Sequence, residues 1–198
     1  GYSGSYPEFL ALYFQAHGGF CRDGDCLILP TWNHLWFLPY LWLYTAALWA
    51  WQRLRPGALD RLTTALAPWL AGAGLWLLPI GALALLRVTL LSRFGSTHAL
   101  VDDWHNHAVY GLLFLAGAVL ARQHSLFERM QERRWAALAA VVAAWAVLML
   151  YFATYHEGHP PPDALRMAQR VLWAAMQWSA IVAVLGFFQI VVLRRRPP

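Results

Sequence analysis

Five long apolar stretches, separated by short polar segments, most limit what this 198-residue chain can fold into. A helix needs about 20 mostly apolar residues to cross the roughly 30 Å hydrocarbon core of a membrane. The stretches that approach this length cover residues 35–51, 70–91, 108–121, 135–152 and 171–193. They predict an all-α fold, a polytopic transmembrane bundle of about five helices that forms a single membrane domain over residues 1–198.

The composition agrees with a membrane protein. Hydrophobic residues make up 60% of the chain and charged residues 13%, against about 25% charged residues in a soluble domain. The net charge of +5 raises the possibility of a nucleic-acid partner. However, all the basic residues are arginines, they cluster between the apolar stretches, and no nucleic-acid-binding motif accompanies them. The predicted partner is therefore the lipid bilayer, with no nucleic acid.

The arginines also predict an orientation. With five crossings, three groups of arginine fall on the same side, which the positive-inside rule makes cytoplasmic. These groups are Arg53, Arg55 and Arg61; Arg122, Arg129, Arg133 and Arg134; and Arg194, Arg195 and Arg196. Residues 1–34 then lie on the opposite, outer side of the membrane. Residues 58–69 (ALDRLTTALAPW) are typical of an amphipathic helix at the membrane surface.

Two cysteines lie on the predicted outer side. Cys21 and Cys26 flank an Asp-Gly-Asp turn in the sequence CRDGDC. A disulfide can persist on the outer side of a cell membrane, where conditions are oxidising, so a Cys21–Cys26 disulfide is the prediction. A zinc site is the weaker alternative because there is no second pair of cysteines to complete it.

Polar residues that could carry chemistry also concentrate on this side. Seven of the eight histidines lie there, namely His17, His34, His98, His105, His107, His156 and His159. Any one of them alone is compatible with a structural role. His34 lies at the start of the first stretch between Trp32 and Trp36, and the densest polar patch is residues 97–107, THALVDDWHNH. Ionisable groups at membrane depth usually face a cavity or a partner.

Asp103 and His107 are the pair of greatest interest in this patch. If a helix begins near Asp102, they lie four residues apart on one helical face. A carboxylate near an imidazole can fix its tautomer and raise its basicity, which suits a general base. Alternatively, Asp102 or Asp103 caps the helix N-terminus. The two interpretations are compatible with each other.

Other spacings give weaker signals. His98 and Asp103 match the H-x4-D spacing of glycerolipid acyltransferases, but the rest of that pattern is missing. His156-Glu-Gly-His159 differs from the H-E-x-x-H zinc motif because its second histidine comes one residue early. The apolar stretches contain no histidine in their interiors to ligate a haem. The sequence therefore predicts no metal and no bound cofactor.

Three arginines lie close to the outer ends of predicted helices. Arg87 is near the end of the second stretch, and Arg166 and Arg170 precede the fifth, one helical turn apart. A guanidinium group can bind a carboxylate or a phosphate through two hydrogen bonds. The simpler interpretation of each arginine alone is a side chain that extends to the membrane surface.

Two stretches resemble a known family. NHLWFLPYLWLY, which contains His34, resembles the His-Leu-Trp-Phe-Leu signature of the acyltransferase family 3 membrane proteins. DDWHNHAVYGLLFLAG resembles the Asp-Trp-x-Asn-His helix entry of the branch that contains glucans biosynthesis protein C. The leading GYSGSYPEFL is similar to outer-loop sequences of bacterial members. The resemblance extends over most of the chain, and the first two motifs carry it.

The resemblance implies an integral membrane acyltransferase with about ten helices. Such an enzyme moves an acetyl, succinyl or similar group from a cytoplasmic acyl-CoA-type donor to an outer carbohydrate or glucan hydroxyl. The acyl group then has to pass through or reach across the bundle. The predicted catalytic residues are His34, Asp103 and His107, and the predicted substrate-binding residues are Trp36, Trp104, Asn106 and Arg87.

The resemblance is incomplete at its first helix. That helix carries the family's best-known arginine and histidine, and no stretch here matches it. The chain is therefore expected to be an internal piece of a longer enzyme and inactive alone, with an engineered chain as the alternative. A non-enzymatic transporter or scaffold, or a membrane metal or redox protein, are the other classes considered. The acyl group, the acceptor and the oligomeric state are not predicted.

Overall fold

The computed structural model describes residues 4–14, 21–22, 25–26, 35–96, 100–101, 103–156 and 158–194. Side chains are described for residues 4–12 and 35–188 of these ranges. The chain divides into two compact units, Gly1–Pro39 and Tyr40–Pro198. Each unit is described by itself.

The first unit contains a short helix and a small hairpin. Helix α1 (Tyr6–Phe14) begins with half of a capping box, because the Ser5 amide donates to Oε2 of Glu8 at 2.8 Å. Strands β1 (Cys21–Arg22) and β2 (Asp25–Cys26) pair antiparallel, with Cys21 opposite Cys26. The two cysteine side chains lie outside the described part, so the disulfide stays a prediction.

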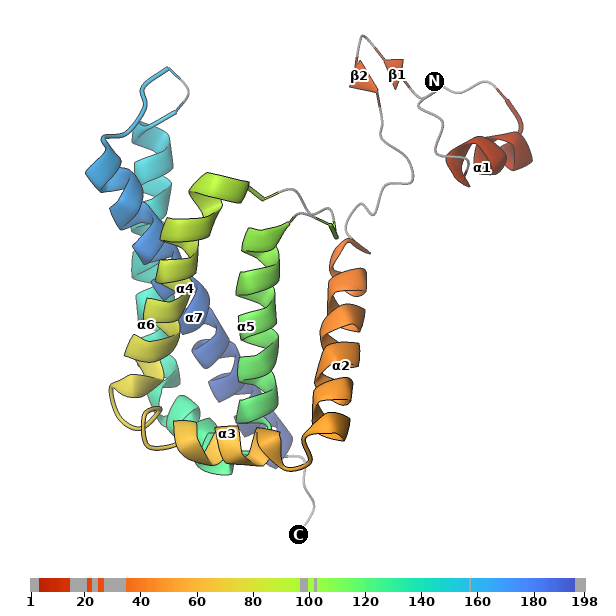
Figure 1. Ribbon diagram of the computed structural model, residues 1–198. Coiled ribbons are helices and arrows are strands. Elements are labelled where there is room, and N and C mark those ends of the chain that lie inside the picture. The colour runs from red at the N-terminus through yellow and green to blue at the C-terminus, as the bar shows by residue number, and fades with distance from the viewer. Residues whose placement is uncertain are drawn as a thin grey trace. The chain divides into compact units, whose positions relative to one another are not determined.

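The second unit is a bundle of helices, and each predicted apolar stretch forms one of them. The elements are α2 (Phe37–Leu54), α3 (Ala58–Leu66), α4 (Gly74–Phe94), α5 (Trp104–Leu120), α6 (His124–Thr154) and α7 (Asp163–Arg194). The long helices run along the length of the bundle, and helix α3 lies across one of its ends (Figure 1). Helices α2 and α5 run in the same direction, whereas α7 is antiparallel to both α4 and α6.

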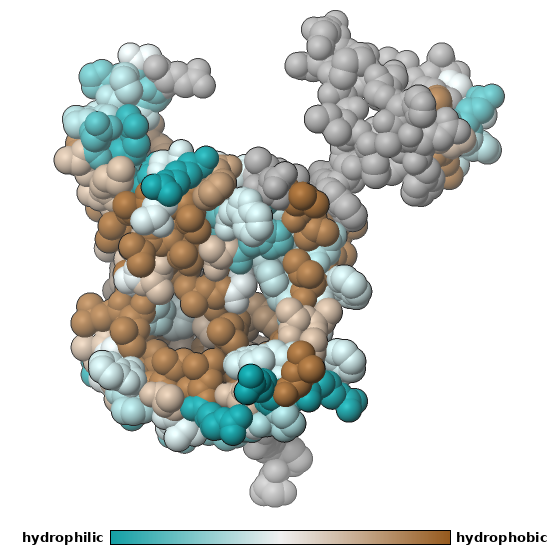
Figure 2. Space-filling model, viewed as in Figure 1, coloured by the Kyte–Doolittle hydropathy of each residue, from teal (hydrophilic) through white to brown (hydrophobic). Residues whose placement is uncertain are grey.

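Within the described residues, three helices are long and apolar enough to cross a membrane. They are Gly74–Phe94, His124–Thr154 and Asp163–Phe188. Helices α2 and α5 have 18 and 17 residues, or about 27 and 26 Å at 1.5 Å per residue. Apolar residues cover the middle of the visible face of this unit, and polar residues gather toward its two ends (Figure 2). The predicted helical fold is confirmed, and three of its described helices have the length and composition of membrane spans. A span for α2 and for α5 stays a prediction.

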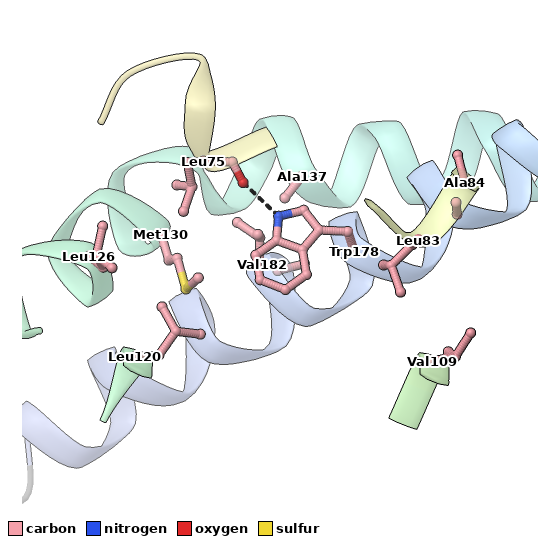
Figure 3. Close-up of a cluster of buried hydrophobic side chains, with 12 residues drawn as sticks. Leu75, Leu83, Ala84, Val109, Leu120, Leu126, Met130, Ala137, Trp178 and Val182 are labelled. Atoms are coloured by element: carbon pink, nitrogen blue, oxygen red, sulfur yellow. Dashed lines mark hydrogen bonds between the residues drawn. The ribbon is translucent and has the colours of Figure 1, made fainter. Parts of the chain in front are cut away.

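The core of this unit lies where α4, α5, α6 and α7 meet. Pro79 is inside α4 and has no amide hydrogen to give to the carbonyl of Leu75, four residues earlier. The Trp178 indole of α7 donates to that carbonyl oxygen at 2.7 Å (Figure 3). An apolar surrounding makes an unsatisfied carbonyl costly. Trp178 therefore supplies the hydrogen bond that Pro79 cannot, and it ties α7 to α4.

Helices α6 and α7 approach closely along small residues. Ala137 and Ala174 are fully buried. A Cβ atom added to Gly186 would lie 2.5 Å from the carbonyl oxygen of Met130 and 2.9 Å from Cβ of Arg134. Only glycine fits at this position without a shift of the backbone. Small residues at such crossings are typical of helices that pack within a membrane.

Polar contacts join three helices at the end of the bundle where α3 lies. Residues 58–66 form the predicted amphipathic helix, with Leu59 and Thr63 buried and Asp60 exposed. Asp60 pairs with Arg122, which also donates to Oε1 of Gln52 at 3.3 Å. These contacts bring the arginine-bearing ends of α2, α3 and α5 together, as the orientation argument requires.

Candidate functional site

Two helices that run in parallel bring the polar motif residues into contact with tyrosines. Tyr40 and Tyr44 are four residues apart on α2, and Asp103 and His107 are four residues apart at the start of α5. The Tyr40 hydroxyl donates to Oδ2 of Asp103 at 2.6 Å. The Tyr44 oxygen lies 3.1 Å from Nδ1 of His107. The equal spacing lets both tyrosines meet their partners, and it confirms that Asp103 and His107 share one face of α5.

Asp103 is fully buried at the N-cap position of α5. Its side chain makes no cap hydrogen bond, so the capping role proposed for this residue is not what the structure shows. Its Oδ2 instead accepts from Tyr40 and, at 2.8 Å, from Nδ2 of Asn106. Asn106 also donates to Oγ of Ser96 at 2.8 Å. The carboxylate therefore links α2, α5 and the residues after α4.

The His107 ring is held from both sides. Its Nε2 lies 2.7 Å from the carbonyl oxygen of Leu100, which can only accept, so Nε2 carries a proton. In the neutral ring Nδ1 is then an acceptor, and the Tyr44 hydroxyl donates to it. The Tyr40 ring stacks on the imidazole with 4.7 Å between centroids. Tyrosine and a backbone carbonyl, rather than the predicted carboxylate, hold the hydrogen bonds of this ring.

A second polar group occupies the face of α5 toward α4 and α7. The Arg87 guanidinium lies 5.3 Å from the centroid of the Trp173 ring. Arg170 donates to the carbonyl oxygen of Val88 at 3.4 Å, which holds it beside α4. Arg87 interacts electrostatically with Arg170 and with Tyr110 and His105 of α5. Arg87 is therefore the common member of a group of ionisable side chains from α4, α5 and α7.

His105 is the most deeply buried member of this second group. It is 3% exposed. Neither ring nitrogen makes a hydrogen bond of normal geometry within the part of the chain that the structure describes. Nε of Arg87 is also buried without such a bond. Buried polar atoms are normally bonded, so this group has unused capacity for a ligand.

Some of the predicted site residues lie together in the structure, and others lie elsewhere. Asp103, Asn106 and His107 lie together at the start of α5, as predicted. Trp104 is 57% exposed, on the outside of the helix, whereas Arg87 is half-buried in the second polar group. Trp36 belongs to the first unit and makes an edge contact with Phe37. His34, His98 and Asp102 lie outside the described residues, so their roles stay predictions.

Sequence reasoning missed the two tyrosines of α2. Tyr40 and Tyr44 were read as part of an apolar, aromatic stretch. Their spacing of four matches that of Asp103 and His107, and this match is the signal that points to them. The partner helix could not be known from the sequence, because α2 and α5 are separated by α3 and α4. His105 belongs to the seven outer histidines of the sequence, and nothing there indicates that its side chain is buried.

The metal interpretations gain no geometric support within the described residues. There, no three His, Cys, Asp or Glu side chains gather as a metal site would require. His156 and His159 face each other across a tight turn, where their backbone groups pair with N–O distances of 3.3 and 2.9 Å. The His159 ring stacks on Tyr155. This pair is part of the turn between α6 and α7.

No protein-family model, no curated protein and no solved structure matches this chain. The two sequence motifs and the contacts at the start of α5 are therefore the features of this chain that bear on its function.

Proposed function

We propose that the chain belongs to an integral membrane acyltransferase of the acyltransferase 3 type. It would move an acetyl, succinyl or similar group from an acyl-CoA-type donor to a carbohydrate or glucan hydroxyl. Residues His34, Asp103 and His107 would act at the site, with Trp36, Trp104, Asn106 and Arg87 near the substrates. The proposed setting is a bacterial inner membrane, with α2 and α5 crossing it beside α4, α6 and α7 and residues 1–34 on the periplasmic side.

One observation supports this proposal above all others. The two stretches that resemble the family are far apart in the sequence, yet the helices that they begin bond to each other. Tyr40 and Tyr44 follow the HLWFL motif, and Asp103 and His107 belong to the DDWHNH motif. A network of this kind, buried at one end of a bundle, suits a reaction site better than a structural anchor.

The His107 contacts support a route for the proton released in acyl transfer. The acceptor oxygen would attack the thioester carbonyl carbon, so that a C–O bond forms and the C–S bond breaks. The hydroxyl proton would pass to the Tyr44 oxygen while the Tyr44 proton moves to Nδ1 of His107. The imidazolium would keep its Nε2–H bond to Leu100 and return the proton through Tyr44 to the departing thiolate.

The test is acyl transfer by the complete natural gene product in native membranes. We expect Tyr44→Phe to lower the transfer rate by 10²-fold or more, because general acid–base assistance typically contributes on the order of 10²–10⁴-fold. His34→Ala and His107→Ala should abolish transfer. Labelled acyl groups on the glucan or polysaccharide fraction give the readout, with immunoblotting to confirm equal expression.

Two matched substitutions serve as controls. Tyr151→Phe in α6 keeps the ring contacts of that tyrosine, and His124 is exposed at the opposite end of the bundle. Neither Tyr151→Phe nor His124→Ala should change the transfer rate. Wild-type transfer in both His34→Ala and His107→Ala would refute the site. Solute flux in proteoliposomes without any acyl transfer would instead favour the transporter alternative.

A further inference from the structure

The second polar group contains more positive charge than its described partners balance. Arg170 of α7 donates to the carbonyl oxygen of Val88, the residue that follows Arg87 in α4, so two like charges lie on neighbouring helices. In the described part of the chain, neither arginine makes an ion pair. The nearby carboxylate, Asp103, already accepts hydrogen bonds from Tyr40 and Asn106. Two neighbouring cations within an apolar bundle are costly unless an anion joins them.

Extension to the membrane surface does not explain these two arginines. The Arg87 guanidinium lies against Trp173 of α7, and its Nε is buried. Arg170 bonds to a backbone carbonyl in the body of α4. Arg166, one turn earlier on α7, shows the contrasting behaviour, because it is exposed and pairs with Asp163 at 3.5 Å. The side chains of Arg87 and Arg170 are half-buried and contact other helices, while Arg166 is exposed.

The side chains at this place offer hydrogen-bond donors that suit an anion. His105 is almost completely buried and can donate from one ring nitrogen. Guanidinium groups present several N–H donors in a plane that matches a carboxylate or a phosphate. A cation would be repelled here, and a neutral ligand would leave the charges uncompensated. The chemistry therefore favours a group with negatively charged oxygens.

We propose that Arg87, Arg170 and His105 form a binding site for one oxyanion group, a carboxylate or phosphate, at the meeting of α4, α5 and α7. The site is distinct from the Tyr40–Asp103 and Tyr44–His107 contacts, which lie on the α2 side of α5. The inference concerns binding alone and does not depend on acyl transfer. The oxyanion belongs either to a free small molecule or to the headgroup of an anionic lipid.

Thermal unfolding of the purified full chain tests the site. The protein in neutral detergent is titrated with sodium phosphate or sodium acetate, with chloride adjusted to constant ionic strength. A ligand that binds only the folded state raises the unfolding temperature as its concentration passes the dissociation constant. We expect Arg87→Gln and Arg170→Gln each to raise the half-saturating concentration at least tenfold. Arg166→Gln is the matched control and should leave it unchanged.

A parallel measurement separates the two sources of the oxyanion. The same variants are unfolded in nanodiscs of phosphatidylcholine, with and without phosphatidylglycerol. Stabilisation by phosphate or acetate that depends on Arg87 and Arg170 identifies a free ligand, and stabilisation confined to phosphatidylglycerol identifies a lipid headgroup. If one of the two variants does not fold, the other decides.

Two results would overturn the proposal. One is a wild-type protein that no arm of the experiment stabilises. The other is an equal loss of binding in Arg166→Gln, which would indicate general attraction to positive charge. A purely structural role for Arg87 also makes a different prediction: Arg87→Gln would then lower the unfolding temperature without anion. Removal of the repulsion from Arg170 should instead leave that temperature unchanged or raise it.

Discussion

Helices α2 and α5 are joined by polar side chains, whereas α6 and α7 are joined by small and aromatic ones. Hydroxyl, carboxylate and imidazole groups meet in the first pair. In the second pair, Gly186 lies against the Met130 carbonyl, and the Trp135 ring meets Phe187 at 4.9 Å. The first pair bonds through a few specific atoms, and the second depends on close approach along the helices.

The difference shows how two helix pairs can be specified when lipid surrounds them. Lipid tails are as apolar as a leucine side chain, so apolar burial gives little preference for one helix over another. The α6–α7 pair gains from van der Waals contact, which needs a small residue where the backbones cross. The α2–α5 pair gains from hydrogen bonds, which fix its register to a single residue. The α2–α5 pair should therefore be destabilised by loss of a hydrogen bond, and the α6–α7 pair by a larger residue at the crossing.

The largest effect is expected from the polar pair. Asp103→Ala removes the acceptor that Tyr40 and Asn106 share, and it leaves buried donors to be satisfied elsewhere. At about 1–3 kcal/mol for each of the two lost hydrogen bonds, the free energy of unfolding should fall by about 2–6 kcal/mol. Denaturant titration in detergent measures it. Asp163→Ala is the control because Asp163 is exposed, and an equal loss in both variants would contradict the assignment.

A smaller effect is expected in the apolar pair. Gly186→Ala places a methyl group 2.5 Å from the Met130 carbonyl oxygen, so the helices must separate. Overpacking of this kind costs about 1–3 kcal/mol. Gly117, on α5, has no atom within 4 Å of an added Cβ, so Gly117→Ala should be neutral or slightly stabilising. If the two alanine variants unfold alike, the close crossing is not a source of stability.

The smallest effect is expected where a polar contact is exposed. Arg122→Gln breaks the ion pair with Asp60 at the α3 end, where both side chains are open to solvent. Exposed pairs contribute about 0–1 kcal/mol and weaken with salt. Unfolding at low and high ionic strength should show a loss below 1 kcal/mol that disappears in high salt. A loss as large as that of Asp103→Ala would show that burial is not what distinguishes the polar pair.

The sequence predicted the helices better than it predicted the site. Apolar length located every long helix of the second unit, because helix formation in a membrane is a local requirement. The helix bounds extend further than the apolar stretches where polar residues continue the helix, as at residues 124–134 of α6. Length and composition support a membrane span for α4, α6 and α7. Helices α2 and α5 are shorter and contain several polar or aromatic side chains.

The site depends on which helices are neighbours in the folded bundle. A short stretch of sequence does not reveal which distant helix it will contact. A spacing of four correctly placed Asp103 and His107 on one face of α5. It could not reveal that the facing helix would be α2 or that tyrosines would provide its contacts. The sequence allows Arg87 and Arg170 either to bind an oxyanion or to extend to the membrane surface, and it predicts a substrate-binding role for Arg87. Nothing in the sequence shows that α4 and α7 lie side by side, so it could not bring the two arginines together.

The bond from Trp178 to the Leu75 carbonyl restricts the order in which this bundle can change during evolution. If the tryptophan were lost first, the Leu75 carbonyl would have no hydrogen-bond donor in its apolar surroundings, because Pro79 has no amide hydrogen. Replacement of the proline first would restore a hydrogen bond within α4 and make the tryptophan dispensable. Pro79 and Trp178, which are 99 residues apart, are therefore expected to change in a fixed order. The proline can be replaced before the tryptophan, but the tryptophan cannot be replaced before the proline without loss of stability.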